Sequence, residues 1–210
     1  MKRARTWKDG SARYLEKAVA ASLRRLGLDY LPIYFLHWPD PKTPLRETFA
    51  ALEALRQQGK ILHIGISNAT ASQIKTALRY AKISFVQARI NFLEKIDREI
   101  IKSCSESGIK ILAYNVLGAG LLTGKFTKDT RFPATDRRSR LSSFTGEGIR
   151  NTDKKLELHR QRADQMGFSL AQYAIHWALK QRFVTSVILG IKNCRQLSEN
   201  LFLDTKTNVI

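Results

Sequence analysis

Apolar residues repeat along this chain at two spacings, and these spacings predict an alternation of strands and helices. The run Leu31 to Leu36 is continuous, is rich in branched and aromatic residues, and ends at the group His37-Trp38-Pro39. Such a run is typical of a buried strand. Residues 11–26 instead carry apolar side chains at helical spacing, and Gly27 follows as a C-terminal cap. Both patterns recur further along the chain.

Five strands and the helices between them follow from this pattern. We expect strands at residues 31–37, 61–66, 83–90, 109–113 and 184–189. Residues that commonly begin helices precede several helical segments, namely Thr43 with Pro44 as the first helical residue, Asp97, Thr152, Ser169 and Asn193. Residues 115–151 interrupt the rhythm, since they are rich in Gly, Thr, Ser and Arg and show no sustained period. A segment of this length is usually functional or mobile.

The order of the elements predicts a mostly parallel sheet, because each strand is followed by a helix. Every predicted strand also ends in polar or glycine-rich residues: His37, Ser67-Asn68, Gln87 to Asn91, Tyr114-Asn115, and Gly190 to Lys192. Side chains delivered to one edge by several parallel strands form the active site of an α/β barrel. A doubly wound sheet would carry a G-x-G-x-x-G fingerprint at its first turn, and the sequence has none. The pattern therefore favours a barrel.

Length and composition restrict the class of protein. The chain of 210 residues, 43% of them hydrophobic, can fill the core of one domain, and we expect residues 1–210 to form that domain. No apolar run reaches the roughly 20 residues that cross a membrane, and no signal core follows the basic N-terminus. We therefore expect a soluble cytoplasmic protein in which Cys104 and Cys194 are free thiols.

The net charge of +18 raises the question of anionic partners. A basic surface can attract nucleic acid, a membrane or anionic small molecules. Here Lys and Arg are spread along the chain, with the densest clusters at Lys2 to Lys8 and Arg137 to Arg140. Aromatic residues are not interleaved with these clusters as they are in stacking modules. We expect a solvated basic surface, with neither nucleic acid nor a membrane as a partner.

Several stretches at the strand ends closely resemble the aldo-keto reductases, a family of (β/α)8 TIM barrels that use NADPH to reduce carbonyl groups. In family order and spacing, they are Ala21 to Tyr30, Leu36 to Pro39, Gly59 to Ile61 with Ile64 to Asn68, Gly118 to Lys125, and Leu189 to Lys192 with Gln196-Leu197 and Glu199-Asn200. The resemblance implies an NADP-dependent oxidoreductase that acts on a small aldehyde or ketone without a metal ion.

The resemblance assigns roles to residues at the strand ends. His37 is similar to the family's active-site histidine, whose neutral imidazole orients the substrate carbonyl and helps to stabilise charge on its oxygen. Ser67, Asn68 and Gln87 match residues that hydrogen-bond the nicotinamide carboxamide, a group with both donors and acceptors. Tyr114 matches the aromatic residue that stacks on the nicotinamide ring.

The remaining matches concern the rest of the cofactor. Leu117, Gly118, Gly120, Leu121 and Lys125 match the loop along the pyrophosphate, whereas Gly190, Lys192, Gln196, Glu199 and Asn200 match the adenosine end. Lys192 and the helix start near Asn193 would suit a 2′-phosphate, which favours NADP over NAD. Taken singly, each residue is as readily an ordinary strand-end, loop or capping residue, so the prediction depends on their occurrence together.

The N-terminal part of the family pattern is missing from the sequence. The barrel needs eight strands and the pattern predicts five, so we expect an incomplete (β/α)8 barrel that lacks its N-terminal strands. The family holds its general-acid tyrosine in an Asp-x-x-x-x-Tyr-Gly stretch, which this sequence does not contain. Lys2 is a candidate for the family's catalytic lysine. Pro32 stands where the family commonly has an aspartate, and a proline there loses one ladder hydrogen bond.

Three functions stay open at this point. The chain is an NADP-dependent carbonyl reductase with impaired activity, a catalytically inactive nucleotide-binding or regulatory relative, or a basic binding protein that keeps only the fold. The open sheet edges of an incomplete barrel would also permit self-association.

Overall fold

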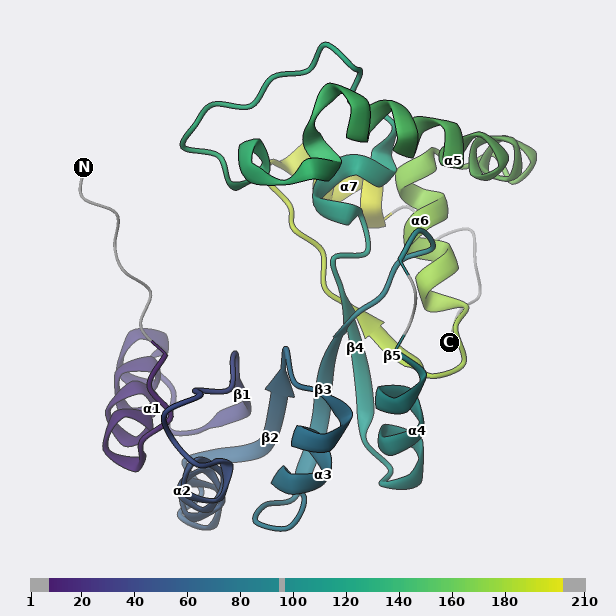
Figure 1. The fold of residues 1–210 in the computed structure, drawn as a ribbon. Helices are drawn as coiled ribbons and strands as arrows, with labels where there is room; N and C mark the ends of the chain where they lie inside the picture. The colour runs from purple at the N-terminus through teal and green to yellow at the C-terminus, as the bar shows by residue number, and fades with distance from the viewer. Residues whose placement is uncertain (1–7, 95–96, 202–210) are drawn as a thin grey trace. The chain divides into compact units, whose positions relative to one another are not determined.

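The computed structural model describes residues 8–94 and 97–201 and confirms the predicted alternation of strands and helices (Figure 1). The strands are β1 (Leu31–Leu36), β2 (Ile61–Ser67), β3 (Ile83–Arg89), β4 (Lys110–Tyr114) and β5 (Val184–Val187). The α-helices are α1 (Ala12–Leu26), α2 (Leu45–Gln57), α3 (Ala71–Ala77), α4 (Arg98–Glu106), α5 (Gly146–Gln165), α6 (Leu170–Leu179) and α7 (Cys194–Leu201). Between β4 and α5 lie the 3-10 helices η1 (Gly118–Thr123), η2 (Arg137–Arg140) and η3 (Ser142–Phe144).

The strands form one sheet in the order β1-β2-β3-β4-β5, and β2 pairs in parallel with both β1 and β3. The register of β2 against β3 shifts between Ile64 and Gly65. Gly65 is required at this point, because a Cβ there would lie 2.2 Å from the ring of Phe35. The α/β class expected from the sequence is therefore confirmed, whereas the absence of barrel strands stays a prediction.

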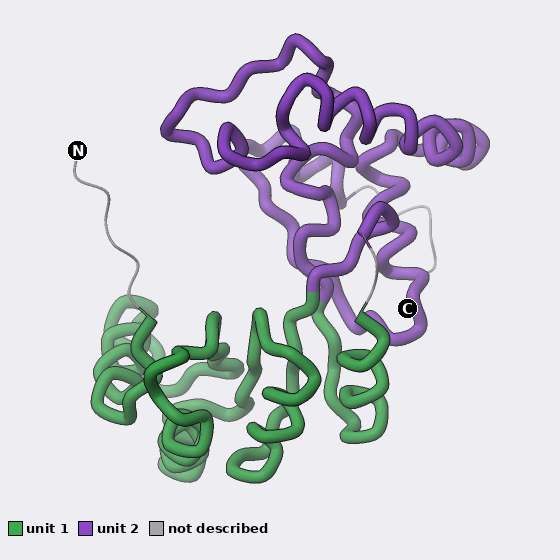
Figure 2. The backbone as a smooth tube through the Cα atoms, viewed as in Figure 1, with its two compact units in different colours: residues 1–88, 97–112 green, residues 89–96, 113–210 purple. Residues whose placement is uncertain are grey.

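The chain divides into two compact units, residues 1–88 with 97–112 and residues 89–96 with 113–210 (Figure 2). In the first unit, contacts run from α1 to α2, from α2 to α3 and from α3 to α4, and α2 also packs against β2. Phe49, Leu52 and Leu55 of α2 and Ile64 and Ile66 of β2 are almost completely buried. Burial of these apolar side chains is the main force that holds the helices on the sheet.

A buried carboxylate fixes the turn after β1. Asp40, 8% exposed, accepts hydrogen bonds from the Thr43 hydroxyl (2.6 Å) and from the Gly10 backbone N–H (3.1 Å). The Thr48 hydroxyl donates in turn to the Gly10 carbonyl (2.9 Å). These bonds explain why the predicted start of α2 is wrong. Because Thr43 bonds Asp40, Pro44 becomes the N-cap, without a side-chain cap bond, and is not the first helical residue.

The second unit contains the segment that shows no period in the sequence. Helix α5 begins at Gly146 with Thr145 as its N-cap, so the predicted start at Thr152 is wrong and Thr152 lies inside the helix. Gly146 and Gly148 occupy the first turn, where they interrupt the helical signal. A Cβ at Gly148 would lie 2.1 Å from the Ser142 carbonyl oxygen, so this glycine permits the close approach of α5 to η3.

Two further expectations concern the whole chain. Cys104 is buried and Cys194 is exposed, and both are free thiols as expected. Burial raises the pKa of the Cys104 thiol to about 11, so this thiol is protonated and unreactive at neutral pH. No helix in the described ranges is long and apolar enough to cross a membrane.

We expect Asp40→Asn to lower the melting temperature at pH 7 by about 2–4 °C, the size of a modest single-site loss in a chain of this length. Hydrogen bonds, chiefly from the Thr43 hydroxyl, hold the pKa of Asp40 below its ordinary value. The stability that Asp40 contributes is therefore fully present above the pKa of the unfolded state, about 4. It is lost as the pH falls through the lower pKa of the folded state. Thermal unfolding from pH 7 to pH 3 measures both effects.

Asp29→Asn is the matched control, because Asp29 is an exposed carboxylate between α1 and β1. We expect this variant to melt with the wild type at every pH. Equal melting temperatures of Asp40→Asn and the wild type at pH 7 would contradict the structural role given to Asp40.

Candidate functional site

The carboxyl ends of β1, β2 and β3 bring four predicted site residues together in the first unit. Asn68 follows β2 with a left-handed backbone (φ 54°) and donates Nδ2 to the His37 carbonyl (2.8 Å) and the Ser67 hydroxyl (3.1 Å). Ser67 is 1% exposed and pairs in register with Gln87 of β3. His37, Ser67, Asn68 and Gln87 therefore lie at one sheet edge, and amide and hydroxyl groups dominate that edge.

The His37 side chain is exposed, so its imidazole is accessible to a ligand. Its ring meets Trp38 edge to face, with 6.3 Å between the centroids. The Lys8 ammonium lies 4.6 Å from the centroid of the Trp38 ring. A neutral imidazole carries one donor and one acceptor nitrogen, so His37 can hydrogen-bond a carbonyl oxygen at this edge.

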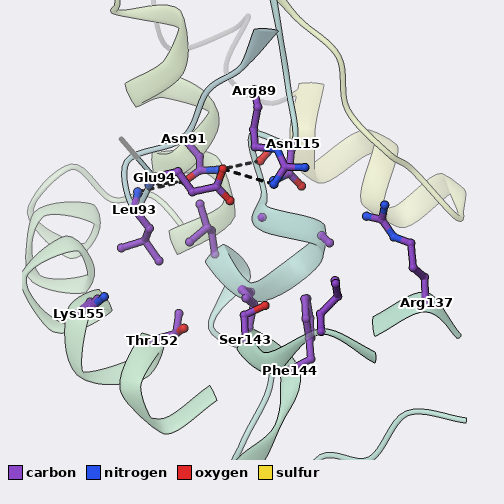
Figure 3. Close-up of a pocket in the computed structure, with 15 residues that line it drawn as sticks. Arg89, Asn91, Leu93, Glu94, Asn115, Arg137, Ser143, Phe144, Thr152 and Lys155 are labelled. Carbon is purple, nitrogen blue, oxygen red and sulfur yellow. Dashed lines mark hydrogen bonds and ion pairs between the residues drawn. The ribbon is translucent and has the colours of Figure 1, made fainter. Parts of the chain in front are cut away.

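In the second unit, Tyr114 ends β4 beside Arg89. The side-chain hydrogen bond between them is the main reason that the pKa of Arg89 is raised, and the Glu94 carboxylate lies 3.7 Å from the Arg89 guanidinium. Asn91, 1% exposed, donates Nδ2 to the Asn115 carbonyl (3.3 Å) and accepts from the Glu94 backbone N–H (3.0 Å) (Figure 3). These bonds connect the loop after β3 to the loop after β4.

The chain after Tyr114 enters η1 through a turn that favours small residues. Gly118, Ala119 and Gly120 have φ values of 55°, 54° and 99°, in the left-handed region that glycine adopts without steric cost. The Leu117 carbonyl accepts hydrogen bonds from the Gly120 and Leu122 N–H groups (2.8 and 3.2 Å) and closes the turn. The Gly118 N–H donates to the Asn115 carbonyl (2.8 Å), so these backbone groups hold the turn together.

A pocket of about 290 Å³ lies against this turn in the second unit (Figure 3). Arg89, Arg137 and Lys155 contribute positive charge to its lining, and Glu94 contributes one negative charge. Other lining residues include Asn91, Asn115, Gly118, Leu121 and Phe144. A pocket with excess positive charge suits a phosphate group.

Lys192 is exposed between β5 and α7. Its backbone N–H donates to the Gln196 side-chain oxygen (2.9 Å), and Asn193 caps α7 by accepting from the Gln196 N–H (2.9 Å). The pKa of Asp136 is lowered to about 2, chiefly by hydrogen bonds from Arg138, and the charge of Lys192 contributes to this lowering. Lys192 is therefore within electrostatic reach of the η2 segment, which also supplies Arg137 to the pocket.

The other residues matched to the cofactor have simpler surroundings. Gly190 is exposed, with open space where a Cβ would lie. The Lys125 side chain is exposed, and the Glu199 carboxylate lies 3.6 Å from the Arg195 guanidinium. Asn200 is half-buried near the end of α7. Nothing in these surroundings by itself indicates adenosine binding.

Sequence reasoning missed three cations that line the pocket. Arg89 had a usable signal, because it follows Gln87 by two residues and side chains two apart on a strand share a face. Arg137 belongs to a basic cluster that is visible in the sequence, but the sequence does not indicate which member faces a pocket. Lys155 could not be placed while the start of α5 was misjudged. Lys2, the candidate for the catalytic lysine, lies outside the described residues.

Within the described part of the chain, His, Cys, Asp and Glu side chains form no group of three that could hold a metal ion. Hydrogen-bond donors and acceptors gather at the sheet edge of the first unit, and positive charge gathers at the pocket of the second unit. Each suits a different chemical group, an amide in the first unit and an anion in the second.

Known proteins share this sequence pattern and fold. The model of the aldo/keto reductase family matches residues 2–205. The chain is 33% identical over 199 residues to the NADH-specific methylglyoxal reductase of Escherichia coli K12, covering 93% of this chain and 60% of that protein. It is 34% identical over 208 residues to the L-glyceraldehyde 3-phosphate reductase of the same organism, covering 91% of this chain and 58% of that protein.

Among solved structures, a glycerol dehydrogenase from Gluconobacter oxydans matches with a TM-score of 0.83 and 27% identity. That match covers 97% of this chain and 68% of the dehydrogenase. This chain spans about three fifths of the length of the two Escherichia coli reductases. The family match covers nearly all 210 residues, and the βα order is the one the family's fold requires. The chain therefore belongs to the aldo/keto reductase family.

Proposed function

We propose that this chain binds a nicotinamide dinucleotide and supports the reduction of an aldehyde or ketone to an alcohol. The observation that carries the proposal is the turn at Gly118 to Gly120 with its positively lined pocket. Neither glycine has a side chain that would obstruct a ligand, and the charge of the lining favours a pyrophosphate. The amide and hydroxyl groups at the first unit's sheet edge complement this, because they suit a carboxamide.

The residues of this chain would share the work of holding the cofactor. Ser67, Asn68 and Gln87 would bind the carboxamide, and Tyr114 would stack on the nicotinamide ring. The hydrogen bonds of Asn68 to the His37 carbonyl and the Ser67 hydroxyl orient its side-chain amide in advance of binding. When bound, the dinucleotide supplies a hydride from its nicotinamide ring.

His37 would act on the substrate. Reduction of a carbonyl leaves an alkoxide oxygen that must be protonated as it forms, and the His37 imidazole can hydrogen-bond that oxygen. A positioned general acid typically contributes about 10²–10⁴-fold to a rate. The sequence contains no Asp-x-x-x-x-Tyr-Gly stretch to hold the tyrosine that serves this purpose in the family. We therefore propose that these 210 residues alone turn over slowly.

We further propose that NADP(H) is preferred over NAD(H). Two exposed cations support the preference, Lys192 before α7 and Arg137 in the pocket lining, because a 2′-phosphate adds negative charge that they can pair with. Related proteins do not decide the matter. One relative is named as NADH-specific, and an aldo-keto reductase of Schizosaccharomyces pombe carries NADP(+) in its name.

The alternative proposal is a nucleotide-binding or regulatory relative without catalysis. The missing tyrosine stretch favours it, because cofactor binding needs none of the residues in that stretch. A basic binding protein that keeps only the fold would bind neither cofactor. Cofactor titration thus separates this third function from the others, and carbonyl turnover separates the first two.

We expect NADPH to bind at least about tenfold more tightly than NADH, because a charge-assisted hydrogen bond contributes roughly 1.5–3 kcal/mol and each 1.4 kcal/mol is about tenfold. Lys192→Ala should remove most of this preference by weakening NADPH alone. Lys154→Ala is the matched control, because Lys154 is an exposed lysine of α5 outside the pocket lining. Calorimetric titration of both cofactors measures the affinities, and equal affinities in the wild type would refute the preference.

We expect the purified chain to reduce an aromatic aldehyde with NADPH at well below about 1 s⁻¹, the low end of ordinary enzymes. His37→Gln should lower the remaining rate by roughly tenfold or more without weakening NADPH binding, since glutamine cannot donate or accept a proton as imidazole does. His63→Gln is the control, because His63 is exposed on β2 and is not one of the candidate site residues. This variant should leave the rate unchanged. A wild-type rate near 1 s⁻¹ would show that the missing tyrosine is dispensable.

A further inference from the structure

Three phenylalanines fold the segment between η1 and α5 around a small core of their own. Phe126, Phe132 and Phe144 form an aromatic triad, with ring centroids 5.2, 5.3 and 5.9 Å apart and steep angles between the rings. Edge-to-face contacts of this kind are favourable beyond simple burial. The triad therefore gives this long segment a fixed conformation, although its sequence shows no period.

Arg138 covers the aromatic triad. Its guanidinium lies 4.5 Å from the centroid of Phe132 and 5.5 Å from that of Phe126. The same guanidinium bonds both carboxylate oxygens of Asp136, with 2.6 Å between Nη2 and Oδ2 and 3.1 Å between Nε and Oδ1. Only 19% of the Arg138 side chain is exposed. A planar guanidinium can stack on a ring and pair with a carboxylate at the same time, which an ammonium cannot do.

The aromatic triad also touches the turn that forms the pocket wall. A Cβ at Gly120 would lie 3.1 Å from Cε2 of Phe126, so the ring is seated directly against this residue. Gly120 has a φ of 99° and precedes Leu121, which lines the pocket. Phe144, the third member of the triad, lines the pocket as well. Phe126 therefore packs beside the left-handed turn that contains Gly120.

We propose that Arg138 is a positioning residue for cofactor binding, which it supports through the aromatic triad and the turn at Gly118 to Gly120 rather than by touching the ligand. This inference rests on the proposed function, because it concerns the same pocket. Its neighbour Arg137 differs, because Arg137 is exposed and lines the pocket, where its charge can act on a ligand directly. Arg137 thus acts on the ligand through its charge, and Arg138 acts on the conformation of the loop.

Lysine substitutions distinguish these two roles. Lysine keeps the positive charge but lacks the planar, forked guanidinium. Arg137→Lys changes a residue of the pocket lining, so it should affect NADPH binding directly and leave the backbone of the turn as it is. Arg138→Lys should weaken it about tenfold, because the stacking on the triad and the paired bond to Asp136 are both lost. Phe132→Leu removes the ring beneath Arg138 and should reproduce the loss.

The experiment measures NADPH affinity by calorimetry well below the melting temperature, and backbone amide hydrogen exchange across Gly118 to Gly124. We expect faster exchange in this range for Arg138→Lys and Phe132→Leu, and unchanged exchange for Arg137→Lys. A purely structural role of Arg138 would lower the melting temperature and leave the affinity of the folded protein unchanged. The affinity measurement therefore separates positioning from general stability.

Wild-type affinity and wild-type exchange in Arg138→Lys would overturn the inference, as would exchange in Arg137→Lys as fast as that in Arg138→Lys. If the wild type binds no NADPH, the proposed function fails and the ligand-directed part of this inference fails with it. The exchange data then still decide whether Arg138 holds the turn, because unchanged exchange in Arg138→Lys would refute that role independently.

Discussion

Where a strand ends, its backbone carbonyls lose the hydrogen bonds that a neighbouring strand would provide. In this chain asparagine side chains donate to such carbonyls instead. Asn68 donates to the His37 carbonyl (2.8 Å), and the buried Asn91 donates to the Asn115 carbonyl (3.3 Å). A buried polar group without a partner costs about 1–3 kcal/mol, so the second bond strongly constrains the path of its loops. The same bonds fix the positions of the strand ends that carry the candidate site residues.

A second constraint acts on the long segment that follows β4. Its 3-10 helices are too short to be stable alone, and the aromatic triad with Arg138 supplies the missing packing. Gly118 of the left-handed turn then lies in the lining of the pocket together with its cations. Long segments of this kind in compact domains are usually functional, and here the fold of the segment itself builds one wall of the candidate site.

The sequence predicts the fold well where local chemistry decides it. Ser169 and Asp97 accept the hydrogen bonds expected of N-caps, and Gly27 ends α1 in the left-handed conformation expected of a C-cap. The sequence fails where one specific hydrogen bond or one close backbone approach decides where a helix begins. Thr43 donates its hydroxyl to Asp40, and Gly148 lies where a Cβ would meet the Ser142 carbonyl oxygen.

The candidate site, like the fold, can be predicted from the sequence only in part. The positions of His37 directly after β1, Ser67 at the end of β2 and Gln87 within β3 are predictable because the pattern of each strand is clear. The place of Arg137 in the pocket lining and the covering position of Arg138 are not predictable, since they depend on how the triad folds a segment without a period. Adjacent arginines look alike in a sequence, and only the packing around them gives them different roles.

If a nicotinamide dinucleotide binds as proposed, the strand-end amides and the turn at Gly118 to Gly120 both respond to it. An NMR titration with NADPH can follow the side-chain amides of Asn68 and Gln87 and the backbone amides of Gly118 to Leu121. We expect both sets of signals to shift and to saturate with the same dissociation constant. Saturable shifts in one set alone, or in neither, would show that the proposed binding mode is wrong.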